Sequence, residues 1–288
     1  MDRIGIIGVG LVGTALAERL VAADYHVIGF DLRTEQMTEL IRIGGEAACC
    51  AADVAANCAR ILLSLPTSEI AGSVLAEILH KLPSRAIVID TTTGAPEDAV
   101  QFGSMLKQAG FEYLDATIGG SSRQVRIGEA IFLCGGSQDG FARCEDLWKH
   151  CCKTAHHVGP VGSGARMKLV MNLVLGLNRA VLAEGLEFAR ASGIDPHIAL
   201  EILKTSPAYS RAMDTKGLRM LNEEFEPEAR LSQHLKDVLL ILASGVQFDA
   251  RLPLSEAHRQ LLEDAVEAGY GAADNSAVIK AFQKSSTI

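Results

Sequence analysis

Short apolar runs alternate with amphipathic stretches through the first half of the chain, from Arg3 to about Val158. Alternation of this kind is typical of strands and helices that follow one another in a parallel sheet. The apolar runs lack a clean two-residue period, as expected for strands that are covered on both faces. Strands are predicted at Ile4–Ile7, Val27–Phe30, Ile61–Leu65, Ala86–Ile89 and Ala130–Leu133. The first half is therefore predicted to be an α/β domain with a doubly wound parallel sheet.

The pattern changes after the turn-forming segment 159–164. The segment that follows, Ala165–Ala191, contains neither proline nor consecutive turn formers, so it predicts a single helix of about seven turns. Its apolar density approaches that of a membrane span, but polar side chains such as Lys168, Asn172 and Glu184 interrupt it. We therefore expect no membrane span, and instead a helix buried between domains or subunits.

Helical patterns continue from there toward the C-terminus, with breaks near Pro196, Pro207 and Pro253 and no further strand signal. The 288 residues of the chain exceed the ~100 to 200 residues of one typical domain. Two domains are predicted, a sheet domain at residues 1–162 and an all-helical domain at residues 163–288, joined by the long helix. Because one small helical domain would cover such an apolar helix poorly, we expect a homodimer or homotetramer.

Charge and cysteine content exclude several classes of function. The formal net charge of -8 gives no basic surface for a nucleic acid partner. The first residues run directly into a strand pattern, which disfavours a secretion signal. Seven cysteines without a recurring spacing predict reduced thiols and a cytoplasmic protein. The cluster of His150, Cys151, Cys152, His156 and His157 lacks the spacing of a zinc site, so no metal is expected.

A glycine-rich turn directly follows the first predicted strand. It has the pattern GxGxxG and opens a predicted helix at Leu11–Ala23. The first glycine permits a tight turn, the second lets the backbone approach a pyrophosphate, and the third allows close packing of helix on strand. The helix N-terminus adds amides and a favourable dipole. The turn therefore predicts a Rossmann-type dinucleotide site, formed here by Gly8, Val9, Gly10, Leu11, Val12 and Gly13.

An acidic residue follows the second predicted strand. Asp31 lies 23 residues after Gly8, close to the ~20 expected for a carboxylate that binds the cofactor ribose. A carboxylate there would accept hydrogen bonds from the ribose hydroxyls and repel a 2′-phosphate. Asp31 therefore favours NAD, and its neighbour Leu32 is also predicted to contact the cofactor. Arg33 could reach a 2′-phosphate, so NADP is the less favoured alternative.

The long helix carries two polar residues on one face near its start. Lys168 and Asn172 are four residues apart, so they lie on the same face of a helix that is otherwise mostly apolar there. A lysine that is partly desolvated would have a lowered pKa and could exchange a proton with a carbonyl or alcohol oxygen. Asn172 could hold the same oxygen. The residues alone equally allow Lys168 to extend to solvent and Asn172 to bond a neighbouring carbonyl.

The chain resembles the β-hydroxyacid dehydrogenases, a family that includes 3-hydroxyisobutyrate dehydrogenase and tartronate semialdehyde reductase. The resemblance extends over nearly the whole sequence. Its motifs are IGIIGVGLVGTALAERL, SLP, VIDTTTGAP, YLDATIGGSSRQVRIGEAIFLCGG, GPVGSGARMKLVMN, HLKD and GYGAADNSA.

The resemblance implies a role for several residues. Lys168 matches the family's proton donor and acceptor, and Asn172 matches the asparagine that orients the substrate. Lys236 looks like a second lysine that reaches the cofactor and substrate. Thr92 looks like the family's hydroxyl residue near the nicotinamide and its ribose. The family's turn against the cofactor's adenine-side ribose and pyrophosphate matches Leu65 and Pro66.

The chain departs from the family in the loop that holds the substrate carboxylate. Where the family usually has Asp-Ala-Pro-Val-Ser-Gly-Gly, this chain has Asp-Ala-Thr-Ile-Gly-Gly-Ser, so Gly119 replaces the usual serine. Backbone amides from Gly119 and Gly120 can still bind an anion, and Ser121 or Ser122 can supply a hydroxyl. A related loop, with glycine in place of the serine and with an arginine and serines nearby, occurs in the sulfolactaldehyde reductases. In such an enzyme Arg123 would help to neutralise a sulfonate or a second acidic group. The polar neighbours Gln124 and Arg126 also allow Arg123 to be simply exposed.

These observations predict an oxidoreductase that moves a hydride between a nicotinamide cofactor and a small 3-hydroxy acid or its semialdehyde. The alternative within the same chemistry is a sulfolactaldehyde-type reductase. Imine reductases share the architecture but usually replace the lysine, so Lys168 disfavours them. Retention of both Lys168 and Asn172 also disfavours a non-catalytic NAD-binding module.

Overall fold

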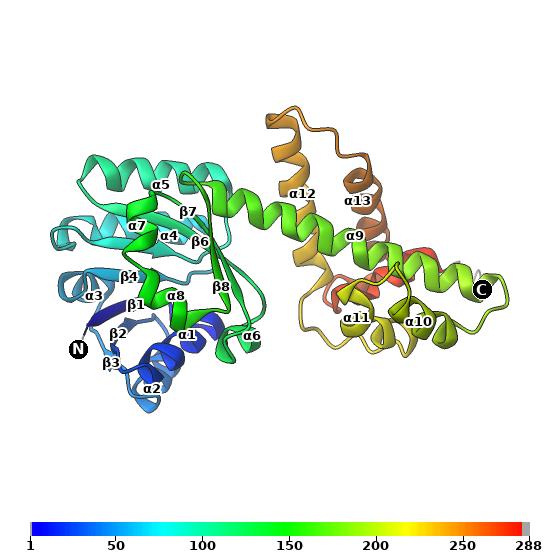
Figure 1. Ribbon diagram of the computed structural model, residues 1–288, viewed down its shortest axis with the longest axis horizontal. Coiled ribbons are helices and arrows are strands. Elements are labelled where there is room, and N and C mark those ends of the chain that lie inside the picture. Colours follow the sequence, from blue (N-terminus) through cyan, green and yellow to red (C-terminus); the bar gives the residue numbers. More distant parts are fainter. Residues whose placement is uncertain (1, 284–288) are drawn as a thin grey trace. The chain divides into compact units, whose positions relative to one another are not determined.

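The computed structural model describes residues 2–283. The chain divides into two compact units, one up to Lys168 and one from Leu169 onward. The division falls inside helix α9 (Ser163–Ala191), a single helix of 29 residues. The first unit contains the sheet, and the second is built from helices (Figure 1).

The first unit is built on one sheet of eight strands in the order β3-β2-β1-β4-β5-β6-β7-β8. The strands are β1 (Arg3–Ile7), β2 (His26–Phe30), β3 (Glu46–Ala47), β4 (Arg60–Leu63), β5 (Ile87–Asp90), β6 (Glu112–Gly119), β7 (Ile131–Gly135) and β8 (Thr154–Gly159). Neighbouring strands are parallel except β6 and β7, which pair in antiparallel fashion. The α/β fold class is confirmed, with one antiparallel pair in a mostly parallel sheet.

Helices cover both faces of this sheet. They are α1 (Leu11–Ala22), α2 (Thr34–Arg42), α3 (Ala51–Asn57), α4 (Ser68–Ile78), α5 (Pro96–Gln108), α6 (Ser122–Arg126), α7 (Gln138–Ala142) and α8 (Glu145–Cys151), with a short 3-10 helix at Leu79–Lys81. Successive strand side chains point to opposite faces. Thus Ile6 packs in the cluster under α1 and α8, whereas Ile7 packs in the cluster under α3, α4 and α5. Both faces of the sheet are buried under helices, which explains why apolar and polar residues do not alternate along the strands.

Three strands, β3, β6 and β8, were not predicted from the sequence. β3 is only two residues long, and β8 is an edge strand in which exposed and half-buried residues alternate. β6 is the longest strand, but it contains Asp115 and Thr117, both 2% exposed. Buried polar side chains are retained only where they find partners, and those of β6 find theirs at Gly162 and in the first turn of α9. The segment expected as a substrate loop is therefore a buried strand up to Gly119.

The strand order reverses between β1 and β4, which lie side by side although two strands intervene in the sequence. In open α/β sheets, ligands bind beyond the carboxyl ends of the strands at such a switch point. The segments that follow β1, β2 and β4 begin with Gly8, Asp31 and Ser64. The topology therefore brings these three residues to the same edge of the sheet.

The second unit contains the rest of α9 and a group of helices around one core. They are α10 (Pro196–Thr205), α11 (Arg211–Leu221), α12 (Leu231–Gln247), α13 (Pro253–Ala265), a π-helical turn at Val266–Tyr270 and a 3-10 helix at Asn275–Phe282. Its core includes Leu186 of α9, Met220 of α11, Val238 of α12 and Leu262 of α13. The described part of this unit is helical, as predicted.

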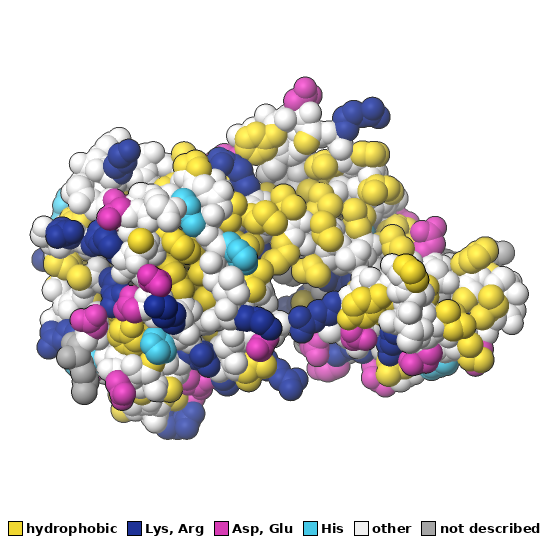
Figure 2. Space-filling model, in the orientation of Figure 1, with side chains coloured by type: hydrophobic (Ala, Val, Ile, Leu, Met, Phe, Trp, Pro, Cys, Tyr) yellow, Lys and Arg dark blue, Asp and Glu magenta, His cyan; other side chains and the backbone are white. Residues whose placement is uncertain are grey.

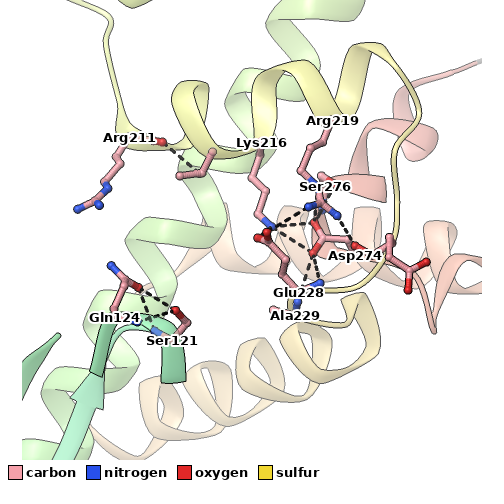
Figure 3. A network of polar contacts seen from close by, with 11 residues as sticks. Ser121, Gln124, Arg211, Lys216, Arg219, Glu228, Ala229, Asp274 and Ser276 are labelled. Carbon is pink, nitrogen blue, oxygen red and sulfur yellow. Dashed lines mark hydrogen bonds and ion pairs between the residues drawn. The ribbon is translucent and has the colours of Figure 1, made fainter. Parts of the chain in front are cut away.

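A buried carboxylate holds the connection between α11 and α12 (Figure 3). Asp274 is fully buried and accepts hydrogen bonds from Nζ of Lys216, from the hydroxyl and amide of Ser276, and from the amides of Glu228 and Ala229. Burial alone would raise the pKa of Asp274, but the bonds from Lys216 and Ser276 outweigh it and lower this pKa to about 2. A buried charge of this kind is tolerated because its acceptor sites are filled.

Helix α9 is the one helix among residues 2–283 that is long and apolar enough, by length and composition alone, to cross a membrane. Only 33% of its most apolar window is buried. Val170, Val174, Val181 and Phe188 are all exposed. Part of the helix is therefore uncovered within one chain, as the sequence led us to expect.

Two histidines are buried against α9 in the second unit. His234 of α12 and His258 of α13 are 6% and 3% exposed, and their ring centroids lie 5.2 Å apart. A Cβ at Gly176 of α9 would overlap the ring of His234, so only glycine admits the pair. Burial and, to a smaller extent, the nearby Arg179 guanidinium lower the pKa of His258 to about 4. Burial, Arg179 and His258 likewise lower the pKa of His234.

We expect acid to destabilise the protein through this pair. Between pH 6.5 and about 4, His258 is protonated in the unfolded chain and neutral in the folded one. Its contribution to stability is therefore complete above pH 6.5 and is lost as the pH falls, by about 1.4 kcal/mol per pH unit. Urea unfolding of the full chain at several pH values, followed by circular dichroism, should show a shallower pH dependence for His258→Leu. The exposed His197 of α10 gives a control, since His197→Leu should follow the wild type. Identical slopes for wild type and His258→Leu would contradict this account.

Candidate active site

The glycine turn after β1 brings the start of α1 against the sheet. Gly8 has φ +93°, a conformation that favours glycine, and a Cβ there would overlap the carbonyl of Ser64. A Cβ at Gly13 would overlap the carbonyl oxygen of Gly8. At Gly10, the N-cap of α1, the nearest atom to a Cβ would be the Arg33 guanidinium at 3.7 Å. Gly8 and Gly13 are thus required by packing, whereas Gly10 leaves open space on the pocket side.

The carboxylate of Asp31 is anchored by backbone amides. Oδ2 accepts a hydrogen bond of 2.9 Å from the amide of Val9, and Oδ1 accepts one of 3.0 Å from the amide of Arg33. The Arg33 guanidinium forms an ion pair with Oδ1 at 3.3 Å. Val9 itself is fully buried. The acidic side chain is therefore fixed beside the glycine turn, with Arg33 directed toward it.

A pocket of about 890 Å³ opens at this switch point, entirely within the first unit. Its lining includes nine of the residues predicted for the cofactor: Gly8, Gly10, Leu11, Val12, Asp31, Leu32, Arg33, Leu65 and Pro66. Val9 and Gly13 lie behind the lining and support it. A dinucleotide half needs a concave site of a few hundred cubic ångströms with polar groups at fixed points, and this pocket provides both.

One wall of the pocket was not predicted. It is the exposed face of α4, and it contributes Glu69, Ile70, Ser73, Val74 and Glu77. The spacing of four residues from Glu69 to Ser73 and on to Glu77 places these three on one helix face. That period is visible in the sequence, but nothing local reveals that the face meets a pocket.

Thr92 lies at the end of β5, in a network that joins the turns after β4 and β5. Its hydroxyl oxygen accepts a hydrogen bond of 3.2 Å from the amide of Leu65, and its own amide donates to Asp90 at 2.9 Å. Asp90 also accepts a bond from the hydroxyl of Tyr113 at 2.9 Å. Burial raises the pKa of Asp90, and the bonds from Thr92 and Tyr113 oppose the rise. Thr92 is 8% exposed, so its hydroxyl position is fixed.

The segment after β6 is a tight turn into α6. Gly119 ends the strand, and Gly120 has φ +150°. Ser121 and Gln124 form a capping box, in which each side chain bonds the other residue's backbone amide (Figure 3). The hydroxyl of Ser121 is therefore engaged in capping α6. Ser122 is half-buried, and Arg123 is exposed on the same helix.

Lys168 is tied to this turn. Its Nζ donates a hydrogen bond of 2.7 Å to the carbonyl oxygen of Ile118, the residue directly before Gly119. The lysine is partly buried. The structure thus brings together Lys168 and the predicted substrate turn, which are about 50 residues apart in the sequence, within one compact unit.

In the second unit, the amide nitrogen of Asn172 donates a hydrogen bond of 3.2 Å to Oδ2 of Asp237 on α12. Lys236 precedes that aspartate and is exposed. Asp237 was not among the predicted site residues, although it stands in the quoted HLKD motif. It fixes the side chain of Asn172 one helical turn beyond Lys168 along α9.

No group of three or more histidine, cysteine, aspartate or glutamate side chains within residues 2–283 could hold a metal ion. All seven cysteines are free.

Two family models match the chain. The model for the NAD binding domain of 6-phosphogluconate dehydrogenase matches residues 3–159. The model for the NAD-binding of NADP-dependent 3-hydroxyisobutyrate dehydrogenase matches residues 162–282. Together they include both the pocket of the first unit and the helices of the second.

Known proteins are similar to this chain over nearly its whole length. The chain is 28% identical over 286 residues to 2-(hydroxymethyl)glutarate dehydrogenase of Eubacterium barkeri, covering 98% of this chain and 95% of that protein. It is 26% identical to L-threonate dehydrogenase of Cupriavidus necator, with 97% and 96% covered. A solved 3-hydroxyisobutyrate dehydrogenase of Mycobacterium tuberculosis, with L-serine, shares the fold with a TM-score of 0.91 at 22% identity, with 98% and 99% covered. The chain therefore belongs to the β-hydroxyacid dehydrogenase family, NAD(P)-dependent oxidoreductases that act on CH–OH groups.

Proposed function

We propose that this enzyme interconverts a small 3-hydroxy acid and its semialdehyde, with Lys168 as general acid and base. The observation that carries the proposal is the hydrogen bond of 2.7 Å between Nζ of Lys168 and the carbonyl of Ile118. It holds a partly buried ammonium group at the start of the turn proposed to bind the substrate carboxylate. The nicotinamide, when bound, donates or accepts the hydride.

In this proposal the protein residues bind, orient and move one proton. The backbone amides of Gly119 and Gly120, with Ser122, hold the carboxylate, while the Ser121 hydroxyl caps α6. Lys168 donates a proton from Nζ to the carbonyl oxygen during reduction and accepts it from the alcohol during oxidation. Asn172, oriented by Asp237, and Lys236 bind the same substrate. Arg123 is exposed and offers its guanidinium to a second acidic group, such as the sulfonate of a sulfolactaldehyde-type substrate.

For the cofactor we propose the switch-point pocket and a preference for NAD over NADP. The pocket lining carries three acidic residues, Asp31, Glu69 and Glu77, and one arginine, Arg33. Arg33 is paired with Asp31. A 2′-phosphate would add about two negative charges to an already acidic wall, whereas ribose hydroxyls can donate hydrogen bonds to Asp31.

We also propose that the enzyme is a homodimer or homotetramer, joined through the second unit. Exposed apolar side chains recur along α9 at Val170, Val174, Val181 and Phe188. Helix α12 carries the exposed Leu239 and Val246, and Figure 2 shows apolar side chains gathered on this face of the helical unit. Large exposed apolar surfaces of this kind mark contact sites.

Activity on a substrate panel tests the proposed function. With NADH or NAD, at least one of 3-hydroxyisobutyrate, L-threonate, 2-(hydroxymethyl)glutarate, tartronate semialdehyde and sulfolactaldehyde should turn over, with a higher kcat/KM than for the NADP(H) form. Lys168→Ala should lower kcat by a factor on the order of 10² or more. The exposed Lys149, paired with Glu145 on α8, provides the control, since Lys149→Ala should keep the rate. A nearly normal kcat in Lys168→Ala would remove Lys168 from the mechanism. Binding of NADH without turnover of any compound would indicate a non-catalytic module.

Variants at two glycines of the turn, Gly10 and Gly13, distinguish an effect on cofactor binding from an effect on folding. At Gly10 an added methyl group meets no protein atom closer than 3.7 Å, but it would face the pyrophosphate. We expect Gly10→Ala to weaken NADH binding by at least tenfold, about 1.4 kcal/mol, with an unchanged melting temperature. At Gly13 the methyl group would overlap the Gly8 carbonyl, so Gly13→Ala should lower the melting temperature. Tight NADH binding by Gly10→Ala, measured by fluorescence titration, would contradict the proposed site.

Sedimentation velocity tests the proposed assembly. We expect a dimer or tetramer for the wild type and dissociation for Val181→Asp combined with Phe188→Asp, because two buried carboxylates would oppose an apolar contact. Ile41 of α2, 58% exposed in the first unit, offers the control Ile41→Asp, which should sediment as the wild type does. A wild type that is monomeric at micromolar concentration rejects the proposal.

A further inference from the structure

Strand β6 makes a series of polar contacts to the beginning of α9, all within the first unit. Oδ1 of Asp115 accepts a hydrogen bond of 2.8 Å from the amide of Gly162, and Oδ2 accepts one of 2.9 Å from the amide of Ala165. The hydroxyl of Thr117 donates a bond of 3.0 Å to the carbonyl of Gly164. Three groups at the start of the helix are thus held by two side chains of one strand.

The packing around these contacts leaves little freedom. A Cβ at Gly164 would overlap the carbonyls of Leu133 and Asp115, and a Cβ at Gly135 of β7 would overlap Oδ1 of Asp115. The backbone of the helix start therefore lies directly against β6 and β7. Since side chains of ordinary size would separate these elements, the two glycines let the carboxylate reach both amides.

The charge of Asp115 suits this position. Burial raises the pKa of Asp115, and the amides of Ala165 and Gly162 oppose the rise. The first amides of a helix have no partner within the helix and carry the positive end of its dipole. An ionised carboxylate that accepts from two such amides fixes both the axial position and the rotation of the helix start.

The rotation matters because Lys168 is on the next turn. Its Nζ reaches the carbonyl of Ile118, which follows Thr117 on the same strand. Residues 115–118 of β6 therefore form hydrogen bonds both to the backbone at the start of the helix and to Nζ of Lys168 one turn later. A shift of the helix start would move Lys168 relative to the turn at Gly119.

We infer that Asp115 is a positioning residue for Lys168, acting through the first turn of α9, with Thr117 as its second contact. The inference rests on the proposed function, in which Lys168 transfers the proton. Asp115 itself need not touch the substrate. Its carboxylate acts on the reaction by holding the helix so that Nζ meets the reacting oxygen.

Asp115→Asn is the sharpest variant, because it keeps the shape and replaces one acceptor oxygen with an NH2 group that would face a backbone N–H. We expect kcat to fall by about 10- to 100-fold, as for a reacting group displaced by a fraction of an ångström to an ångström, with an unchanged Kd for NADH. Thr117→Val, which removes only the hydroxyl, should lower kcat less than Asp115→Asn does. Thr117→Ser, which keeps the hydroxyl, should have the kcat of the wild type. This second series applies even if Asp115→Asn does not fold.

A double-mutant cycle with Lys168→Ala separates positioning from general damage. In the Lys168→Ala background, Asp115→Asn and Thr117→Val should have no further effect on kcat, because no lysine remains to be placed. Ethylamine added to Lys168→Ala should restore part of the rate, and equally so with aspartate or asparagine at position 115. Asp146→Asn is the matched control, since Asp146 is bonded to Arg60 and Tyr25 in the same unit and its loss should leave kcat unchanged.

Each outcome of these experiments either supports or overturns the inference. Additive losses in the cycle, or an amine rescue that depends on position 115, would overturn the positioning role while leaving Lys168 as the proton donor. A normal kcat in both Asp115→Asn and Thr117→Val would do the same. A normal kcat in Lys168→Ala would instead remove the proposed function and the inference together.

Discussion

The first turn of a helix leaves backbone N–H groups that the helix itself cannot satisfy, and the start of α9 is buried, where water cannot satisfy them. Strands β6 and β7 meet this constraint. A carboxylate on β6 accepts from the amides of Gly162 and Ala165. For the carboxylate to reach them, the helix backbone must touch the strands, which is possible because glycines occupy positions 135 and 164. The polar strand in the interior and the glycine-rich helix start therefore have a common cause, and Lys168 follows one helical turn later.

The same helix meets different demands along its length. In the first unit its residues are fixed by hydrogen bonds to β6. In the second unit its inner face packs around Leu182 and Leu186, and Gly176 admits two imidazole rings. Its outer face keeps apolar side chains exposed. Hydrogen bonds are directional, whereas apolar burial is not, so the bonds from β6 fix the orientation of the end of the helix that carries Lys168.

Local patterns in the sequence were enough for the fold class and the cofactor turn. The strand β1, the glycines after it and Asp31 lie within about thirty residues, so their spacing already reflects their geometry. The family resemblance and the reaction class are confirmed as well. β6 was missed because burial of Asp115 and Thr117 depends on partners about 50 residues later. A pattern of apolar residues cannot indicate such partners.

Some features of the candidate site likewise have a local signal in the sequence, and others do not. The capping box at Ser121 could have been found, because serine followed three residues later by glutamine is a known helix start signal, and it changes which hydroxyl is available to a substrate. The acidic face of α4 and the bond between Asn172 and Asp237 have no such local signal. Both arise where two elements distant in sequence pack together. At these positions tertiary contacts, rather than motifs, decide what each polar group can still bind.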